Sequence, residues 1–332
     1  MPKACPPQAL SAERTPFMSS NRPVLGRFAP TPSGRMHLGN VFSALMAWLS
    51  ARSAGGELLL RIEDLDTLRC TDENAEIIRQ DLRRLGLTWD YETPPQHTRS
   101  AYYEEVLAEL RERGEVYPCW CTRGDLKNVL NAPHAADGHP VYPGTCRALS
   151  EEERRSRTQK KAPLLRLRVP EEEISFTDTI FGEYRENLAR DCGDFILRRA
   201  DGVFTYQLAV TADDIAAGVT QVVRGSDLLS STPRQLYIYR LLGAPEPAFT
   251  HVPLLTAPDG RRLSKRDADL DLGVLFQSYT APQLLGALAA AAGLIPKYDE
   301  CTAEELVPLY NPQKIGTADR EVRLPAPNRQ KT

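Results

Sequence analysis

The chain has 332 residues, of which 42% are hydrophobic and 26% are charged, and its formal net charge is −3. This composition is typical of a folded, soluble protein and excludes a disordered one. A chain of this length exceeds the size at which a single core keeps growing, so two or three domains are expected. The small net charge does not exclude RNA as a partner, because basic residues can gather on one face. No apolar run has the length of a membrane span, so a cytoplasmic protein without membrane contacts is expected.

The cysteines indicate a reducing compartment. There are seven of them, an odd number at uneven spacing, which argues against the disulfide framework of a secreted protein. Three of them lie between residues 119 and 146, a density more typical of a metal site. Residues 1–22 lack the apolar core of a signal peptide and are predicted to form a flexible tail.

Residues 23–116 alternate between strand and helix patterns. Residues 24–30 (VLGRFAP) predict a short strand, and residues 38–53 (LGNVFSALMAWLSARS) carry apolar side chains at helical spacing. Residues 57–64 (ELLLRIED) have the continuous apolar run of a buried strand, and residues 72–85 predict a second helix. This order predicts an α/β, doubly wound fold with a Rossmann-type parallel sheet.

Residues 117–189 interrupt this pattern and predict an inserted α+β subdomain. They contain a cluster of cysteines and a loop rich in proline, histidine and glycine. The charge run at residues 151–161 (EEERRSRTQKK) predicts a solvated helix or loop. Strand-like segments follow at residues 164–170 and 174–182.

The α/β pattern resumes over residues 190–260. A helix is expected near residues 211–218, and Tyr206 is expected at a sheet edge before it. Residues 261–332 are predicted to hold a loop, a short helical region and, from residue 318 onward, a tail. The second half of the parallel sheet is therefore expected after the insert.

The turn between the first strand and the first helix carries a candidate nucleotide site, PSGRMHLGN at residues 32–40. Sheets of this kind place ligands at such turns, where the free N–H groups and the dipole of the helix attract phosphate. His37 and Asn40 lie one helical turn apart, so both can reach a triphosphate or a ribose. Gly34 and Gly39 allow the backbone to approach a ligand closely. The alternative is a structural turn with a capping histidine.

A second candidate motif, RRLSKR, occupies residues 261–266. Lys265 places a cation on a loop, where it can stabilise negative charge that develops at a phosphate. A basic loop alone is usually solvated surface. Together and in this order, however, the two motifs resemble the HIGH and KMSKS motifs of class I aminoacyl-tRNA synthetases.

That resemblance implies an enzyme that uses ATP with Mg²⁺ and forms an aminoacyl-adenylate. It implies catalytic roles for His37, Asn40 and Lys265, with Asn40 standing where the family motif ends in histidine. It also implies a set of residues that bind ATP: Pro30, Gly34, His37, Gly39, Asn40, Leu263, Ser264 and Lys265.

The surroundings of both motifs resemble the glutamyl/glutaminyl branch of these enzymes. GRFAPTPSGRMHLGN, LLLRIEDLDTLR and TYQLAVTADDIAAGVTQVVRGSDLLSSTPRQ carry the resemblance, which covers residues 24–275. Arg27 and Arg224 could each hold a carboxylate, and Glu63 could accept from an ammonium group; internal salt bridges are the alternative for each. The resemblance implies a glutamate-binding set of Arg27, Phe28, Ala29, Pro30, Thr31, Glu63, Tyr206 and Arg224.

The cysteine cluster predicts a zinc site. Cys119, Cys121 and Cys146 supply three thiolates at short spacing, and general ligand preference favours His139 as the fourth ligand. Some glutamyl-type enzymes carry a C-x-C…Y-x-x-x-C site in an inserted subdomain, and that resemblance implies Tyr142 instead. Zinc would be structural there, stabilising a small subdomain. Three reduced cysteines without a metal are the alternative.

The chain after the lysine loop is short. Only 66 residues follow Arg266, whereas an anticodon-binding domain of the usual kind would need on the order of 100–150 residues. A core of this type resembles the synthetases that attach glutamate to queuosine in the anticodon loop of tRNA(Asp). The resemblance implies L-glutamate and queuosine-bearing tRNA(Asp) as partners, and a monomer is expected. The alternatives are charging of the 3′ end of tRNA(Glu), an inactive synthetase-like binding protein, and another nucleotidyltransferase of the superfamily.

Overall fold

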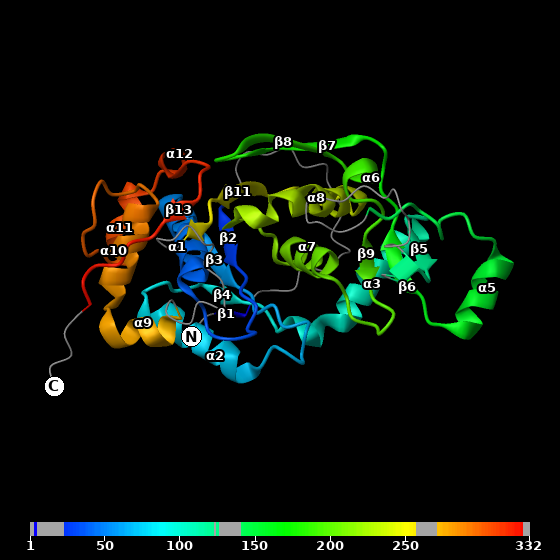
Figure 1. Ribbon diagram of the computed structural model, residues 1–332, viewed down its shortest axis with the longest axis horizontal. Coiled ribbons are helices and arrows are strands. Elements are labelled where there is room, and N and C mark those ends of the chain that lie inside the picture. Colours follow the sequence, from blue (N-terminus) through cyan, green and yellow to red (C-terminus); the bar gives the residue numbers. More distant parts are fainter. Residues whose placement is uncertain (1–2, 5–22, 123, 126–140, 257–270, 328–332) are drawn as a thin grey trace.

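The computed structural model describes residues 3–4, 23–122, 124–125, 141–256 and 271–327. Figure 1 shows an elongated molecule whose parallel sheet lies between an orange-to-red helical end and an opposite, green end. Among the described residues, no helix combines the length and apolar character that a membrane span needs.

A six-stranded parallel sheet forms the centre of the fold. Its pairs are all parallel, and its strands lie in the order β1 (Lys3–Ala4), β4 (Tyr91–Glu92), β3 (Glu57–Leu60), β2 (Leu25–Phe28), β10 (Gln221–Gly225) and β11 (Ala248–Val252). The direction of winding reverses between β2 and β10. Ligands bind at such a switch point, beside the carboxyl ends of the strands. The predicted doubly wound fold is thereby confirmed.

Helices cover both faces of this sheet. They are α1 (Leu38–Ser53), α2 (Asp72–Arg84), α3 (Ser100–Glu112), α7 (Tyr206–Ala217) and α8 (Thr232–Leu241). In β3, Leu58 and Leu60 pack into the core that contains α1, whereas Leu59 packs into the core that contains α3, α7 and α8. Burial on both faces explains why this strand has an unbroken apolar run.

A smaller antiparallel sheet follows α3. It consists of β5 (Val116–Cys119), β6 (Leu164–Leu167) and β9 (Ile196–Arg198). The β9 segment was expected to begin the second half of the parallel sheet. Instead, β9 pairs with β6 in the antiparallel direction. The charge run forms α5 (Glu151–Lys160), which has no buried residue, as its composition predicted.

A hairpin links the smaller sheet to the parallel sheet. Its strands are β7 (Glu173–Asp178) and β8 (Gly182–Asn187), and the short α6 (Leu188–Asp191) follows. Thr179 N donates to Phe249 O across 3.0 Å, and the Thr250 hydroxyl donates to the Thr179 hydroxyl across 2.9 Å. These contacts fasten the hairpin to β11 and bring Asp178 to the edge of the parallel sheet.

The described residues after 270 pack against α1. They form α9 (Leu272–Ser278), α10 (Ala281–Ala291), α11 (Ala303–Leu306) and α12 (Pro312–Ile315), with apolar side chains that join the same core. β12 (Leu255–Thr256) pairs in parallel with β13 (Arg320–Glu321). The prediction of a tail from residue 318 onward is therefore wrong for β13. Short 3₁₀ helices within the described residues are η1 (Gln96–Arg99), η2 (Ser226–Ser231) and η4 (Val307–Leu309).

Two further segments differ from their predictions. Tyr206 is the first residue of α7 and not part of a sheet edge. The apolar run that follows it is typical of a strand in isolation, but here it is wound into a helix that ends at Gly218, whose φ of 70° suits glycine. In the segment predicted as a flexible tail, Lys3–Ala4 form β1 beside β4, and residues 5–22 lie outside the described part.

Candidate active site and cysteine cluster

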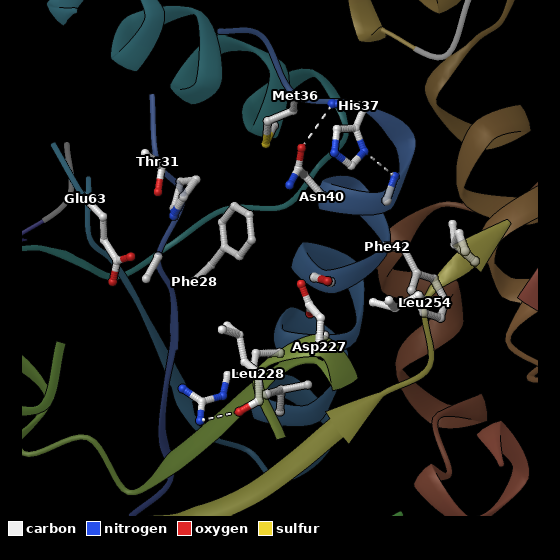
Figure 2. A pocket seen from close by; sticks show the side chains of 18 of the residues that line it. Phe28, Thr31, Met36, His37, Asn40, Phe42, Glu63, Asp227, Leu228 and Leu254 are labelled. Carbon is white, nitrogen blue, oxygen red and sulfur yellow. Dashed lines mark hydrogen bonds between the residues drawn. The ribbon is translucent and has the colours of Figure 1, made fainter. Parts of the chain in front are cut away.

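A cavity of about 750 Å³ opens at the switch point of the parallel sheet. Figure 2 shows Glu63 on one side of it, His37 and Asn40 on the other, and Phe28 between them. The cavity gathers every described residue of the predicted site, namely Arg27, Phe28, Ala29, Pro30, Thr31, Gly34, His37, Gly39, Asn40, Glu63, Tyr206 and Arg224. Leu263, Ser264 and Lys265 lie outside the described residues.

His37 caps the N-terminus of α1. Its Nδ1 accepts a hydrogen bond from Gly39 N at 3.1 Å, and its own N–H donates to Asn40 Oδ1 at 3.2 Å. A side chain on Gly39 would bring its Cβ within 3.0 Å of the imidazole, so glycine keeps the ring in this position. The positive end of a sixteen-residue helix therefore points at the cavity with its cap already formed.

Arg35 secures the loop before this helix. Its Nε and Nη2 donate to Asp81 of α2 across 2.9 and 2.7 Å, a bidentate pair. Hydrogen bonding to Asp81 raises the pKa of Arg35 above its ordinary value. Sequence reasoning did not single out Arg35, although it lies inside the motif and lines the cavity.

Arg61 organises the floor beside Glu63. Its side chain is fully buried and contacts Asp214 Oδ1 at 2.5 Å and Glu63 Oε1 at 3.1 Å. Asp214 also accepts from Arg27 Nε at 3.5 Å, so one carboxylate contacts two arginines. Burial raises the pKa of Glu63, while the charges of Arg61 and Arg27 oppose that shift. The sequence offered no signal for Arg61 or Asp214 beyond their buried surroundings.

Arg224 is a buried cation whose partners are all neutral. It donates to His251 Nε2 at 3.0 Å, Gln235 Oε1 at 2.9 Å and Thr232 Oγ1 at 2.7 Å, and its side chain is 5% exposed. Among the described residues, no carboxylate contacts it. Burial lowers the pKa of Arg224, and the nearby charge of Arg27 adds to that shift. The cavity is therefore prepared for an anion at this point.

Two more residues of the cavity are Tyr206 and Asp227. Tyr206 lines the cavity, and burial raises its pKa against the opposing charge of Arg224. Asp227 of η2 also lines the cavity. Sequence reasoning missed it, although it stands three residues after Arg224 in a segment that was quoted for its resemblance.

The three cysteines converge in a second, separate cluster. The Sγ atoms of Cys119, Cys121 and Cys146 lie within 4.8 Å of one another. The Tyr142 hydroxyl lies 3.4 Å from Cys119 Sγ and 3.9 Å from Cys121 Sγ. His139, the other candidate ligand, lies outside the described residues. The arrangement could hold a metal ion.

The spacing of the sulfur atoms suits zinc. Tetrahedral thiolates about 2.3 Å from the ion would stand about 3.8 Å apart, and Cys121 and Cys146 are 3.7 Å apart. Arg166 Nε donates to Cys119 Sγ at 3.4 Å. Burial and the neighbouring Cys119 raise the pKa of Cys121 to about 12, so this thiol keeps its proton at neutral pH unless a cation enters.

The parallel sheet, the capped helix at its switch point and the paired cavity arginines define a class I aminoacyl-tRNA synthetase catalytic domain. The family model described as "tRNA synthetases class I (E and Q), catalytic domain" matches residues 23–281. The chain belongs to this family and, within it, to the glutamyl-Q tRNA(Asp) synthetases, which are ligases.

Two relatives support that placement. The glutamyl-Q tRNA(Asp) synthetase of Symbiobacterium thermophilum is 48% identical, over 91% of this chain and 96% of its own length. The enzyme of the same name from Nitratidesulfovibrio vulgaris is 47% identical, over 89% of this chain and 94% of its own length. The match thus extends well beyond the catalytic motifs.

A solved structure is similar in fold. It is a glutamate tRNA ligase from Elizabethkingia meningosepticum in complex with its amino acid, with a TM-score of 0.78 and 25% identity. The similarity covers 91% of this chain and 68% of that chain. The class implies ATP as a reactant and Mg²⁺ as the metal ion that accompanies it.

Proposed function

We propose that this chain activates L-glutamate with ATP and transfers it to queuosine in tRNA(Asp). The observation that carries the glutamate half is Arg224, a buried guanidinium without a carboxylate partner among the described residues. Arg27 faces the same cavity. Two arginines at one site suit a ligand with two carboxylates.

The remaining glutamate contacts follow from the same cavity. The Glu63 carboxylate accepts from the ammonium group of the substrate, and the Tyr206 hydroxyl completes the polar wall. The hydrogen bond from Arg61 directs the Glu63 carboxylate, and the charge of Arg61 favours its ionised form against the effect of burial. Phe28, Ala29, Pro30 and Thr31 form the turn that lies along the substrate.

Adenylate formation takes place beside the His37 end of the cavity. An oxygen of the α-carboxylate attacks the α-phosphorus of ATP, the bond to the β-phosphate oxygen breaks, and pyrophosphate leaves. Because His37 Nδ1 accepts from Gly39, its proton belongs on Nε2, which can donate to a phosphate oxygen. Lys265 offsets charge on the leaving group. Mg²⁺ bound with ATP supplies further positive charge at the phosphates.

Transfer then needs no protein nucleophile. A hydroxyl of the queuosine ring attacks the carbonyl carbon of the adenylate, an ester bond forms, and AMP leaves with the electrons of the broken bond. The hydroxyl proton passes to solvent or to AMP. Positioning and electrostatic stabilisation account for the rate enhancement.

The cysteine cluster contributes a structural site in this proposal. Cys119, Cys121, Cys146 and Tyr142 would hold Zn²⁺, with all four positions closed to substrate. The observation that supports it is the convergence of these four side chains within one small core. Zinc would there stabilise the fold of the smaller sheet.

Two experiments test the function. Purified protein should exchange labelled pyrophosphate into ATP when glutamate is present and tRNA is absent; exchange with no amino acid, or only with another one, would contradict glutamate activation. Labelled glutamate should then appear in the nuclease fragment that contains the anticodon of tRNA(Asp). Label at the 3′ end, with queuosine-free tRNA equally active, would instead identify an enzyme that charges the acceptor end.

A further inference from the structure

A buried chain of three side chains leads from the cavity to the β7–β8 hairpin. Arg224 Nε donates to His251 Nε2 across 3.0 Å, and His251 Nδ1 lies 2.7 Å from Asp178 Oδ2. All three side chains are at most 5% exposed. Arginine can only donate, so His251 Nε2 must accept and the ring proton must sit on Nδ1, where it is donated to Asp178.

We propose that Asp178 and His251 are positioning residues that hold the Arg224 guanidinium in the orientation that receives a carboxylate of glutamate, and that they do so only while His251 is neutral. The inference rests on the proposed function, because it takes Arg224 as a glutamate contact. The inference adds Asp178 and His251 to the residues that support glutamate binding. It also adds the requirement that His251 be neutral, which glutamate binding by itself does not impose.

The guanidinium is held from three directions. Gln235 accepts from Nη1 and Thr232 accepts from Nη2, while His251 accepts from Nε. A planar group fixed at all three nitrogens is preorganised, which reduces the entropy lost when a carboxylate binds. Gln235 and Thr232 accept at every pH. His251 stops accepting when it is protonated, so it is the conditional member of the set.

The β7–β8 hairpin holds Asp178, the side chain of these three that lies farthest from Arg224, in place. Asp178 accepts from the backbone N–H groups of Ile180 and Phe181, each at 2.9 Å, and from His251 N at 2.9 Å. Burial opposes ionisation, but hydrogen bonds from His251, Phe181 and Ile180 keep the pKa of Asp178 below its usual range. The carboxylate is therefore charged and unable to rotate, and it selects the Nδ1–H form of His251.

The surroundings of His251 set the sign of the pH dependence. The charged groups that face it are Asp178 from β7, Arg224 from β10 and Arg27 from β2, and α8 adds the Thr232 hydroxyl at 3.2 Å. Burial lowers the pKa of His251, Asp178 opposes that shift, and the two arginines add to it. Protonation would set Nε2–H against the Nε–H of Arg224. Because the pKa of His251 is lowered, the neutral form should persist at the ordinary histidine value of about 6.5, and glutamate affinity should fall only at lower pH.

The test is equilibrium binding of labelled glutamate in the absence of ATP, from pH 8 to pH 5.5. Both carboxyl groups of glutamate stay ionised in that range. At pH 7.5, His251→Phe should weaken binding by about tenfold or more, because the Nε–H loses its acceptor. His251→Gln can accept from Arg224 and donate to Asp178, and it should stay within about threefold of the wild type.

The pH profile separates positioning from a general structural role. Wild-type affinity should be constant above pH 6.5 and decline only at lower pH, since the pKa of His251 lies below its ordinary value. The decline should approach about tenfold per pH unit once the neutral form is the minority. His251→Gln should decline less than the wild type, and any decline that remains reports protonation of Glu63, whose pKa is raised by burial. His97→Gln is the matched control, because it removes a histidine that contacts another carboxylate, Asp64, outside the cavity, and it should leave the decline in place. The KM for ATP should not change in either His251 variant.

Two results would overturn the inference. One is wild-type glutamate affinity in His251→Phe, which would mean that Arg224 is positioned without the histidine. The other is an undiminished acidic decline in His251→Gln; this comparison stands even where the phenylalanine variant does not fold. A wild-type protein that binds no glutamate at any pH would instead contradict the proposed function.

Discussion

Arg61 and Asp214 form a buried ion pair that joins the end of β3 to α7. The Nη1–Oδ1 distance is 2.5 Å, and the two side chains are 0% and 5% exposed. Asp214 also contacts Arg27 of β2, and Arg61 also contacts Glu63. The pair therefore connects the groups proposed to hold the carboxylate and the ammonium of glutamate, and fixes their separation.

Loss of this pair should be costly for stability. Arg61→Met should lower the free energy of unfolding by about 3–5 kcal/mol, because the variant leaves Glu63 buried without its ion-pair partner and Asp214 with only the more distant Arg27. Urea denaturation followed by circular dichroism measures the change. Arg199→Met removes an exposed pair with Asp201 and should alter stability by about 1 kcal/mol or less. Equal destabilisation by both variants would contradict the assignment.

Substitutions at His37 should distinguish its role as a helix cap from its proposed catalytic role. Asparagine caps a helix well, so His37→Asn should stay close to wild-type stability, whereas His37→Ala should lose about 1 kcal/mol. Both variants should lose pyrophosphate exchange by about 10²-fold, since neither can donate from the Nε2 position. Thermal denaturation and exchange assays on the same preparations test this. Wild-type exchange in His37→Asn would reduce the histidine to a structural cap.

Arg224→Lys should impair glutamate binding although the charge is kept. Lysine carries its three donors on one nitrogen and cannot reproduce the planar fork of Arg224, so the KM for glutamate should rise by about 10- to 100-fold, with the KM for ATP unchanged. Steady-state exchange kinetics measure both constants. Arg240→Lys, in an exposed pair with Glu246, is the control and should behave as wild type. A parallel rise in both KM values would point to general damage.

Zinc content should depend on the cysteine cluster alone. Purified protein should contain about one zinc per chain by elemental analysis, and Cys121→Ser should reduce that amount and lower the thermal midpoint. Cys301→Ser should retain the metal, since Cys301 lies outside the cluster. Tyr142→Phe tests the fourth ligand. Full zinc occupancy in that variant would favour His139 or another donor.

Lys265→Ala should abolish most of the activation step. Removal of a cation at the developing charge should slow exchange by about 10²- to 10³-fold or more. Lys297→Ala removes an exposed lysine and serves as the control. Exchange at the wild-type rate in Lys265→Ala would refute the role assigned to the lysine loop.

The sequence by itself determined the sheet class and the two ends of the site. The α1 segment was predicted to the residue, because a capping histidine, helical apolar spacing and a glycine pair mark it locally. Arg27, Glu63 and Arg224 were identified from resemblance and residue chemistry, and the structure places them around one cavity. These features depend on short segments whose pattern is visible without the partners they fold against.

The tertiary structure decided which segments, distant in the sequence, contact one another. Residues 208–210 have a strand-like pattern, yet they form part of α7, where all three apolar side chains are buried, two of them in the core shared with α3 and α8. Arg61 and Asp214 are 153 positions apart, and Asp178 and His251 are 73 apart. No local pattern announces such pairs, since a buried charge is stable only beside a partner that folding brings to it.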